Sequence, residues 1–182
     1  MDTEALLRVF SGCASQEIHR FFSTNACIGA TAITCDVMAH YGRVAEPWQV
    51  CLRVDHDVCH LDVGCFPPSS ESDMGGHLVV IVEDAFLVDS SFRQVRSACP
   101  RLRSPDVFVG RLQPHPPPLL ELYAFATSFA LISYRQRAIS RDYRLLPDWG
   151  PSTEREAAAA AIVRRIDSYR TLSGVDTTKD TN

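Results

Sequence analysis

Residues 75–89, GGHLVVIVEDAFLVD, decide the fold of this chain. Two short runs within them, 77–82 and 85–89, are rich in Val, Leu, Ile and Phe, the residue types that strands favour. Glu83 and Asp84 form a polar turn between the two runs, so the stretch predicts an antiparallel β-hairpin. This hairpin is the centre of a predicted antiparallel sheet.

The residues before the hairpin begin with helices. Residues 3–22 carry apolar side chains at helical spacing, with Ser11 and Gly12 expected to break them into two short helices. Three consecutive cap-forming residues at 23–25 precede a helix predicted over 26–41. Small and apolar residues lie on every face of this second helix, which is the pattern of a helix buried in the middle of a domain.

Further strand signals lie on both sides of the hairpin. Residues 48–54 alternate like a strand, and residues 56–65 continue it irregularly. A loop is predicted over 66–73, and the PHPPP run at 114–118 breaks the chain. The stretch 119–137 is ambiguous, with helical spacing at first and strand character at its end.

The C-terminal part of the domain is predicted to be a helix. The segment 153–156, Thr-Glu-Arg-Glu, is a capping box, and the helix behind it has an apolar stripe of Ala159, Ile162, Val163, Ile166 and Tyr169. Residues 173–182 are polar and are expected to form a flexible tail. Residues 1–172 are therefore expected to form a single α+β domain, in which the central helix packs on an antiparallel sheet.

Composition narrows the class of protein. The 182 residues are 46% hydrophobic and 22% charged, which is the balance of a globular domain that needs neither disulfides nor a structural metal. The net charge of −4 is spread along the chain, so we expect no nucleic-acid partner. The first ten residues are acidic and no apolar run approaches the roughly 18 residues of a membrane span, so we expect a cytoplasmic protein without a membrane partner. Its seven cysteines are then expected to be reduced thiols.

One of these cysteines stands where a nucleophile is expected. Cys27 falls in the first turn of the predicted central helix, where unpaired backbone N–H groups and the helix dipole favour the thiolate form. His77 opens one strand of the hairpin and Asp89 ends the other, so adjacent antiparallel strands can bring the two side chains together. An imidazole can hold a thiolate as an ion pair, and a carboxylate can fix the imidazole's tautomer. These residues are therefore the predicted catalytic triad.

Other residues are expected to complete the site. Gly75 and Gly76 are predicted to leave open space in front of the imidazole, and the backbone N–H of Cys27 is a candidate oxyanion donor. Trp48 and Gln94 are candidates for lining a substrate cleft. We expect no cofactor and no metal at this site.

The segments that carry the triad, NACIGATAITCDVMAHYGRVAEPWQV, GGHLVVIV and FLVDSSF, resemble the transglutaminase-like group of the papain-like superfamily. That group has Cys, His and Asp in this order, and the resemblance covers residues 24–95. It implies a papain-like fold and acyl transfer through a thioester. The spacing is also similar to peptidoglycan amidases of the NlpC/P60 type, in which a Cys-bearing helix precedes a His strand. Both resemblances imply the same mechanism.

The expected function is cysteine-dependent acyl transfer on a peptide, amide or acyl-thioester substrate, with water or an amine as acceptor. Ile28 and Leu78 stand where the transglutaminase-like group has aromatic residues, which motivates a second hypothesis of an inactive binding or scaffold protein. A third hypothesis is a metal-binding regulator built on the His, Cys and Asp side chains of residues 55–65, although their spacing matches no standard zinc site.

Overall fold

The computed structural model describes residues 1–21, 27–65, 75–113, 122–136 and 142–172. Four predicted segments lie outside these residues: the cap formers at 23–25, the loop at 66–73, the PHPPP run at 114–118 and the tail at 173–182. Helices and an antiparallel sheet together make an α+β fold, as predicted. Among the described residues, no helix combines the length and the apolar character needed to cross a membrane.

The chain begins and ends with helices, with the strands between them. The helices are α1 (Thr3–Phe21), α2 (Cys27–His40), α3 (Arg93–Ala98) and α4 (Thr153–Leu172), with short 3-10 turns η1 (Tyr143–Leu145) and η2 (Pro147–Trp149). The strands are β1 (Ala45–His56), β2 (Cys59–Val63), β3 (His77–Val82), β4 (Phe86–Asp89), β5 (Phe108–Arg111), β6 (Leu122–Ala126) and β7 (Leu131–Gln136).

The seven strands form one antiparallel sheet in the order β5-β4-β3-β1-β7-β6, with β2 paired to β1 off this path. The predicted hairpin is confirmed within one residue as β3 and β4. Its turn residues Glu83 and Asp84 both have positive φ, 53° and 52°, the backbone twist that a two-residue hairpin favours. Strand β1 is the longest and runs through the middle of the sheet, where it pairs with β2, β3 and β7.

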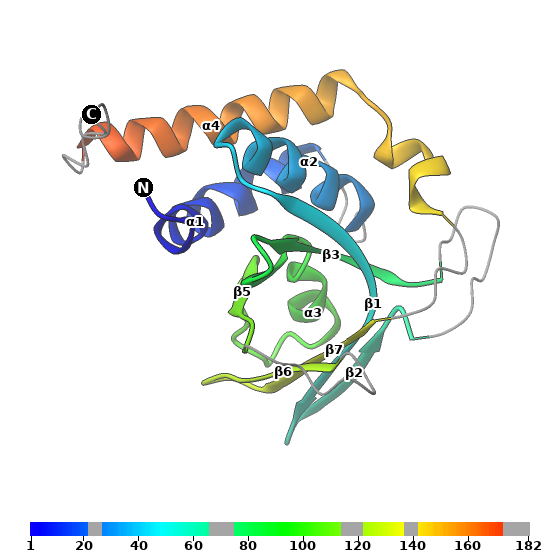
Figure 1. Cartoon of the computed structure of the whole chain (residues 1–182). Coiled ribbons are helices and arrows are strands. Elements are labelled where there is room, and N and C mark those ends of the chain that lie inside the picture. Colours follow the sequence, from blue (N-terminus) through cyan, green and yellow to red (C-terminus); the bar gives the residue numbers. More distant parts are fainter. Residues whose placement is uncertain (22–26, 66–74, 114–121, 137–141, 173–182) are drawn as a thin grey trace.

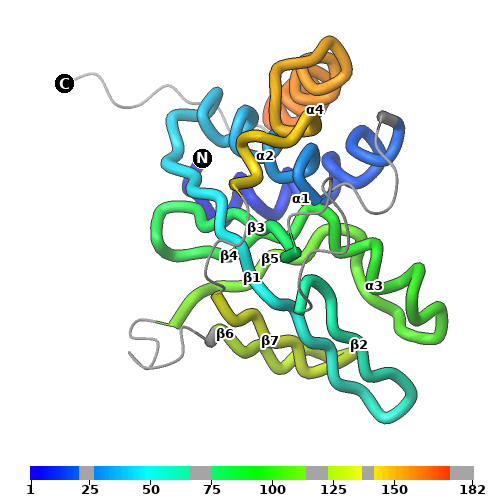
Figure 2. Tube along the Cα trace, turned by 90° about the vertical axis from the view of Figure 1, so that its right-hand side faces the viewer, coloured from blue at the N-terminus to red at the C-terminus, as the bar shows by residue number. Residues whose placement is uncertain are grey.

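The sheet separates two hydrophobic cores. Helices α1, α2 and α4 cover one face, where Phe10, Ile33 and Ile162 pack on Val80 and Val88. The sheet curls around α3 on its other face (Figure 1), and this second core includes Phe92, Phe108 and Tyr134. Figure 2 shows the same division from the side, with the three long helices together above the strands. The α2 helix is thus buried between α4 and the sheet, as its apolar pattern predicts.

Two helix predictions needed correction. Helix α1 is continuous through Ser11 and Gly12, because buried residues on both sides of the glycine belong to one core and a glycine inside a helix costs only about 1 kcal/mol. Ser152, one residue before the predicted box, caps α4 by accepting a hydrogen bond from Arg155 N at 3.1 Å. Tyr169 of the predicted apolar stripe is exposed.

The other differences between the predicted and the observed elements involve strands that pair with distant parts of the chain. The described part of the ambiguous stretch 119–137 consists of β6 and β7, which pair with each other and place β7 against β1. The irregular continuation at 56–65 is a separate strand, β2, that folds back on β1. The α3 helix and β5 carry no signal that our sequence analysis detected. Cys51 and Cys65 form a disulfide, contrary to the expectation that all seven thiols are reduced.

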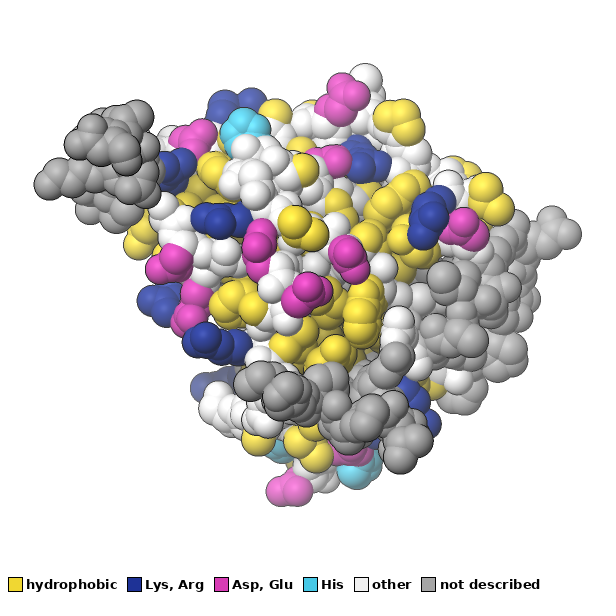
Figure 3. Space-filling view, in the orientation of Figure 1, with side chains coloured by type: hydrophobic (Ala, Val, Ile, Leu, Met, Phe, Trp, Pro, Cys, Tyr) yellow, Lys and Arg dark blue, Asp and Glu magenta, His cyan; other side chains and the backbone are white. Residues whose placement is uncertain are grey.

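Charged side chains of both signs are interspersed on the face of the molecule seen in Figure 3. They surround apolar side chains near the centre of this view. This mixed surface agrees with the even spread of charge along the sequence.

Candidate active site

The hairpin brings His77 and Asp89 together. The β3–β4 register pairs Val80 with Val88, so Asp89, the next residue of β4, lies toward the start of β3, where His77 stands. His77 Nε2 lies 2.7 Å from Asp89 Oδ2, and the two side chains are 1% and 0% exposed. A histidine and a carboxylate removed from water at this distance form a charge-assisted hydrogen bond.

Asp89 is held by further donors that do not come from the triad. The backbone N and side-chain Oγ of Ser91 both donate to Asp89 Oδ1, at 3.1 and 3.2 Å. The hydroxyl of Tyr134, from β7, donates to Asp89 Oδ2 at 3.1 Å. Burial and the nearby carboxylate raise the pKa of Tyr134 well above its usual value, so its hydroxyl keeps its proton. The carboxylate therefore has partners on both oxygens, which a buried charge needs.

Gln94 occupies the other side of the imidazole. This residue belongs to α3, and its Nε2 lies 2.9 Å from His77 Nδ1. A neutral ring with its proton on Nε2 accepts from the amide nitrogen at Nδ1, whereas an imidazolium donates to an amide oxygen there. Rotation of the Gln94 amide by half a turn satisfies either state. The sequence analysis placed Gln94 in a substrate cleft, and the structure places it against the ring of His77.

Cys27 is the third predicted member of the triad. It is the first residue of α2, so its backbone N–H has no acceptor within the helix. Its partly exposed thiol lies near enough to the His77 side chain to raise the pKa of that ring. Burial alone would lower the pKa of His77, but the Asp89 carboxylate and the Cys27 thiol outweigh it and raise this pKa to about 10. The ring is thus an imidazolium at neutral pH, near the Cys27 thiol and bonded to the Asp89 carboxylate.

An apolar wall borders Cys27. Cys27, Ile28 and Trp149 pack against a buried cluster made of Leu78 from β3 and of Tyr143 and Leu146 from the η1–η2 segment. The rings of Tyr143 and Trp149 meet edge to face, with centroids 4.7 Å apart. Cys27 and this aromatic pair therefore belong to one apolar cluster.

Arg155 fastens this wall to α2. Its guanidinium makes two hydrogen bonds to Asp36 of α2, at 2.6 and 2.7 Å, and a third to the carbonyl oxygen of Trp149. It also lies over the Trp149 ring, 5.6 Å from its centroid. One side chain of α4 thus links the aromatic pair to the helix that bears Cys27.

The Gln49 side chain fills the space beside Gly76. A Cβ on Gly76 would lie 2.5 Å from Gln49 Nε2 and 2.7 Å from Gln49 Cγ, so the buried Gln49 side chain covers this glycine. Gly75 has a φ of +67°, a conformation that glycine adopts without strain. Gly76 therefore permits close packing, and Gly75 permits a turn.

Trp48 lies on β1 in the core that surrounds α3. It pairs with Val79 in the sheet register, and its ring is 6.0 Å from that of Tyr123. The residues described around Cys27 do not include it. The aromatic residue at the Cys27 wall is instead Trp149, whose position depends on a contact between segments more than 100 residues apart in the sequence.

The remaining free thiols contact no histidine in the described interactions. Burial raises the pKa of Cys35 to about 12, and burial with a hydrogen bond to Cys99 raises that of Cys59 to about 11. No group of three or more His, Cys, Asp or Glu side chains with metal-binding geometry occurs in the described ranges. In the stretch proposed for a metal regulator, His60 instead pairs with Asp55 at 3.1 Å on the surface.

Comparisons with protein-family models, with curated proteins and with solved structures find no match for this chain. The assignment of a function therefore depends on the geometry of the site. The sequence analysis missed Tyr134 and Ser91, both of which hold Asp89. Ser91 follows Asp89 by two residues, the spacing at which a carboxylate commonly bonds its own backbone, so this signal was available.

Proposed function

We propose that this protein is a cysteine-dependent acyl-transfer enzyme with Cys27 as nucleophile, His77 as acid and base, and Asp89 as the residue that orients His77. The observation that carries the proposal is the position of the His77 ring, which contacts both the Cys27 thiol and the Asp89 carboxylate. A thiol, an imidazole and a carboxylate in one chain of contacts are the parts that nucleophilic thiol catalysis needs. The order and placement of these residues also support the papain-like, transglutaminase-like architecture expected from the sequence.

The mechanism follows from the charges. The imidazolium of His77 stabilises the thiolate of Cys27, which attacks the carbonyl carbon of an amide, ester or thioester. The N–H of Cys27, which has no acceptor within α2, donates to the oxyanion. His77 then transfers its proton to the leaving group, and the thioester acyl-enzyme remains. Water or an amine, deprotonated by the neutral ring, attacks the thioester and regenerates the thiolate.

The wall beside Cys27 supports a preference among substrates. Ile28 and Trp149 are only partly buried and offer apolar surface near the nucleophile. A peptide, amide or acyl thioester whose acyl side carries an apolar group gains burial there.

We place the protein in the cytoplasm, where the Cys51–Cys65 disulfide is exposed to thiol reductants.

The test is the rate of iodoacetamide labelling at each cysteine as a function of pH, read by peptide mass spectrometry. We expect Cys27 to label fastest at pH 6, and His77→Ala to slow it by roughly tenfold or more, since a free thiol with a pKa of about 8.5 is mostly protonated there. Cys13, which contacts no histidine, is the internal reference. Equal labelling of Cys27 in both proteins would contradict the proposal.

The alternative of a binding or scaffold protein is favoured by one observation. His77 is only 1% exposed, and the Gln94 amide lies against the nitrogen that a catalytic base needs free. On this alternative, Cys27 labels no faster than the other partly exposed thiols at any pH.

A further inference from the structure

Two strands share one edge of β1 and meet beside His77. Residues 45–50 of β1 pair with β3, whose first residue, His77, lies opposite Val50. Residues 52–56 of the same strand pair with β2, which ends at Val63. Cys51 lies between the two registers, so β2 and β3 abut at this position.

Gly64 fills the junction between the two strands. It follows β2, has a φ of +67°, and leaves no room for a side chain, because a Cβ there would collide with the backbone of Gly76 and with the amide nitrogen of His77. Contact this close between two backbones requires glycine. Gly64 therefore packs directly on the main chain that carries the imidazole.

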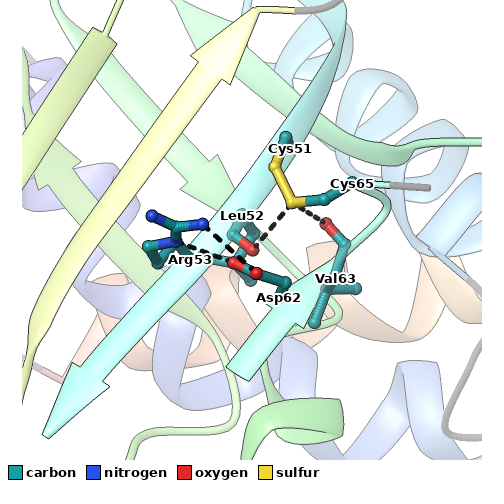
Figure 4. Close-up of a disulfide and its surroundings, with 6 residues drawn as sticks. All are labelled: Cys51, Leu52, Arg53, Asp62, Val63 and Cys65. Carbon is teal, nitrogen blue, oxygen red and sulfur yellow. Dashed lines mark hydrogen bonds and ion pairs between the residues drawn. A yellow bond between two sulfur atoms is a disulfide. The ribbon is translucent and has the colours of Figure 1, made fainter. Parts of the chain in front are cut away.

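The Cys51–Cys65 disulfide closes this junction (Figure 4). Its Cα atoms are 4.7 Å apart, and its two sulfur atoms join β1 to the end of the β2 segment. Cys51 follows Val50, the register partner of His77, and Cys65 follows Gly64, the residue packed on the His77 nitrogen. Each half of the disulfide is thus one residue away from a backbone contact of His77.

We infer that the Cys51–Cys65 disulfide is a redox-sensitive positioning element for His77, and this inference rests on the proposed function. The disulfide holds Gly64 against the start of β3, and this contact fixes the backbone from which the imidazole reaches Cys27. In the described strand registers, Cys51 is paired with no residue of β2 or β3. The disulfide therefore connects β1 to the β2 segment at a position where strand pairing does not.

The element can be switched by a dithiol reductant. One thiolate of the reductant attacks a disulfide sulfur, the second displaces the mixed disulfide, and the products are two protein thiols and one oxidised reductant. Two electrons and two protons pass to the protein. Both half-cystines are partly exposed, so the reductant can reach them. Reduction releases Gly64 from the junction and loosens the start of β3.

The experiment compares the oxidised protein, the dithiothreitol-reduced protein and the double variant Cys51→Ser/Cys65→Ser. Cys27 alkylation at pH 6 and amide hydrogen exchange at residues 77–79 are measured on each. We expect Cys27 alkylation to fall about tenfold when the bond is lost, because small displacements of a catalytic group have effects of this size. We also expect faster exchange at 77–79, with both changes reversed by reoxidation of the wild type.

A matched control is Cys59→Ser/Cys99→Ser. It removes a pair of thiols that connects Cys59, the first residue of β2, to Cys99, the residue after α3. This control should leave both measurements unchanged. If His77→Ala slows Cys27 alkylation but loss of the disulfide changes neither alkylation nor exchange, the inference is overturned and the proposed function stands. In a second case, loss of the disulfide speeds exchange at 77–79 but His77→Ala does not change the alkylation of Cys27. The disulfide then positions the strand, but the proposed function fails, and the inferred effect of the disulfide on catalysis fails with it.

Discussion

His77 Nε2 lies 2.7 Å from Asp89 Oδ2, and neither side chain has appreciable contact with solvent. A buried pair of this kind stabilises the protein only while both charges are present, since removal of one partner leaves the other uncompensated at a cost of about 3–5 kcal/mol. The same contact that orients a catalytic imidazole is therefore also a part of the folding free energy.

The first prediction concerns the pH dependence of this stabilisation. The pKa of His77 is about 10 in the folded protein, above the value of about 6.5 in an unfolded chain, so folding favours the protonated ring. The contribution is complete below about pH 6.5 and is lost as the pH rises toward 10. Urea unfolding of wild type and Asp89→Asn should give a difference of about 3 kcal/mol at pH 6 that shrinks steadily up to pH 10. A difference that grows with pH would have the wrong sign for this mechanism.

The second prediction concerns Tyr134. Replacement by Phe removes one donor to Asp89 Oδ2 and leaves the other hydrogen bonds of this carboxylate in place. We expect Tyr134→Phe to lower the free energy of unfolding by about 1.5–3 kcal/mol, the range for a hydrogen bond to a charged group. Cys27 alkylation should change less than it does in His77→Ala.

The control for Tyr134 is Tyr169→Phe, because Tyr169 is an exposed tyrosine on α4. Its replacement should change the free energy of unfolding by no more than about 0.5 kcal/mol. A loss of stability as large in Tyr169→Phe as in Tyr134→Phe would show that the bond to Asp89 has no special weight.

The sequence predicted the parts of the site that are local. The β3–β4 hairpin follows from two dense apolar runs around a polar turn, and the helix predicted over 26–41 matches α2 to within one residue at each end. The placement of Cys27 in the first turn of α2 and the contact between His77 and Asp89 were therefore predicted. The contact of Gln94 with His77 was not predicted, because the six-residue helix that carries Gln94 is too short for periodicity to reveal.

The missed features depend on contacts between distant segments. Tyr134 is 45 residues from Asp89 and reaches it only because β7 pairs with β1. The Cys51–Cys65 disulfide depends on where β2 ends and β3 begins along one edge of β1, which no spacing of cysteines encodes. Residue propensities and the spacing of apolar residues do not indicate which strands pair or at which residues, because contacts between distant segments decide the pairing.

The third prediction concerns the wall beside Cys27. Arg155→Ala removes the guanidinium that links Asp36 to the carbonyl of Trp149, so the η1–η2 segment should move away from the thiol. We expect alkylation of Cys27 to rise by a similar factor at every pH, because access changes while the contact with His77 remains. Arg164→Ala, an exposed arginine on the same helix, is the control. A change in the shape of the pH profile, rather than its height, would contradict this role for Arg155.

The fourth prediction separates an enzyme from an inert protein of the same fold. The wild type should form a mass adduct on Cys27 when it is mixed with an activated aryl ester or an aryl thioester, and the adduct should decay in water or pass to an added amine. Cys27→Ala should retain the fold, since a small apolar residue replaces a partly exposed thiol, and should form no adduct. His77→Ala should form the adduct slowly and should also release it slowly, because the same ring activates the thiol and the acceptor. An adduct that forms rapidly but never turns over would identify a reactive thiol without the base that catalysis needs.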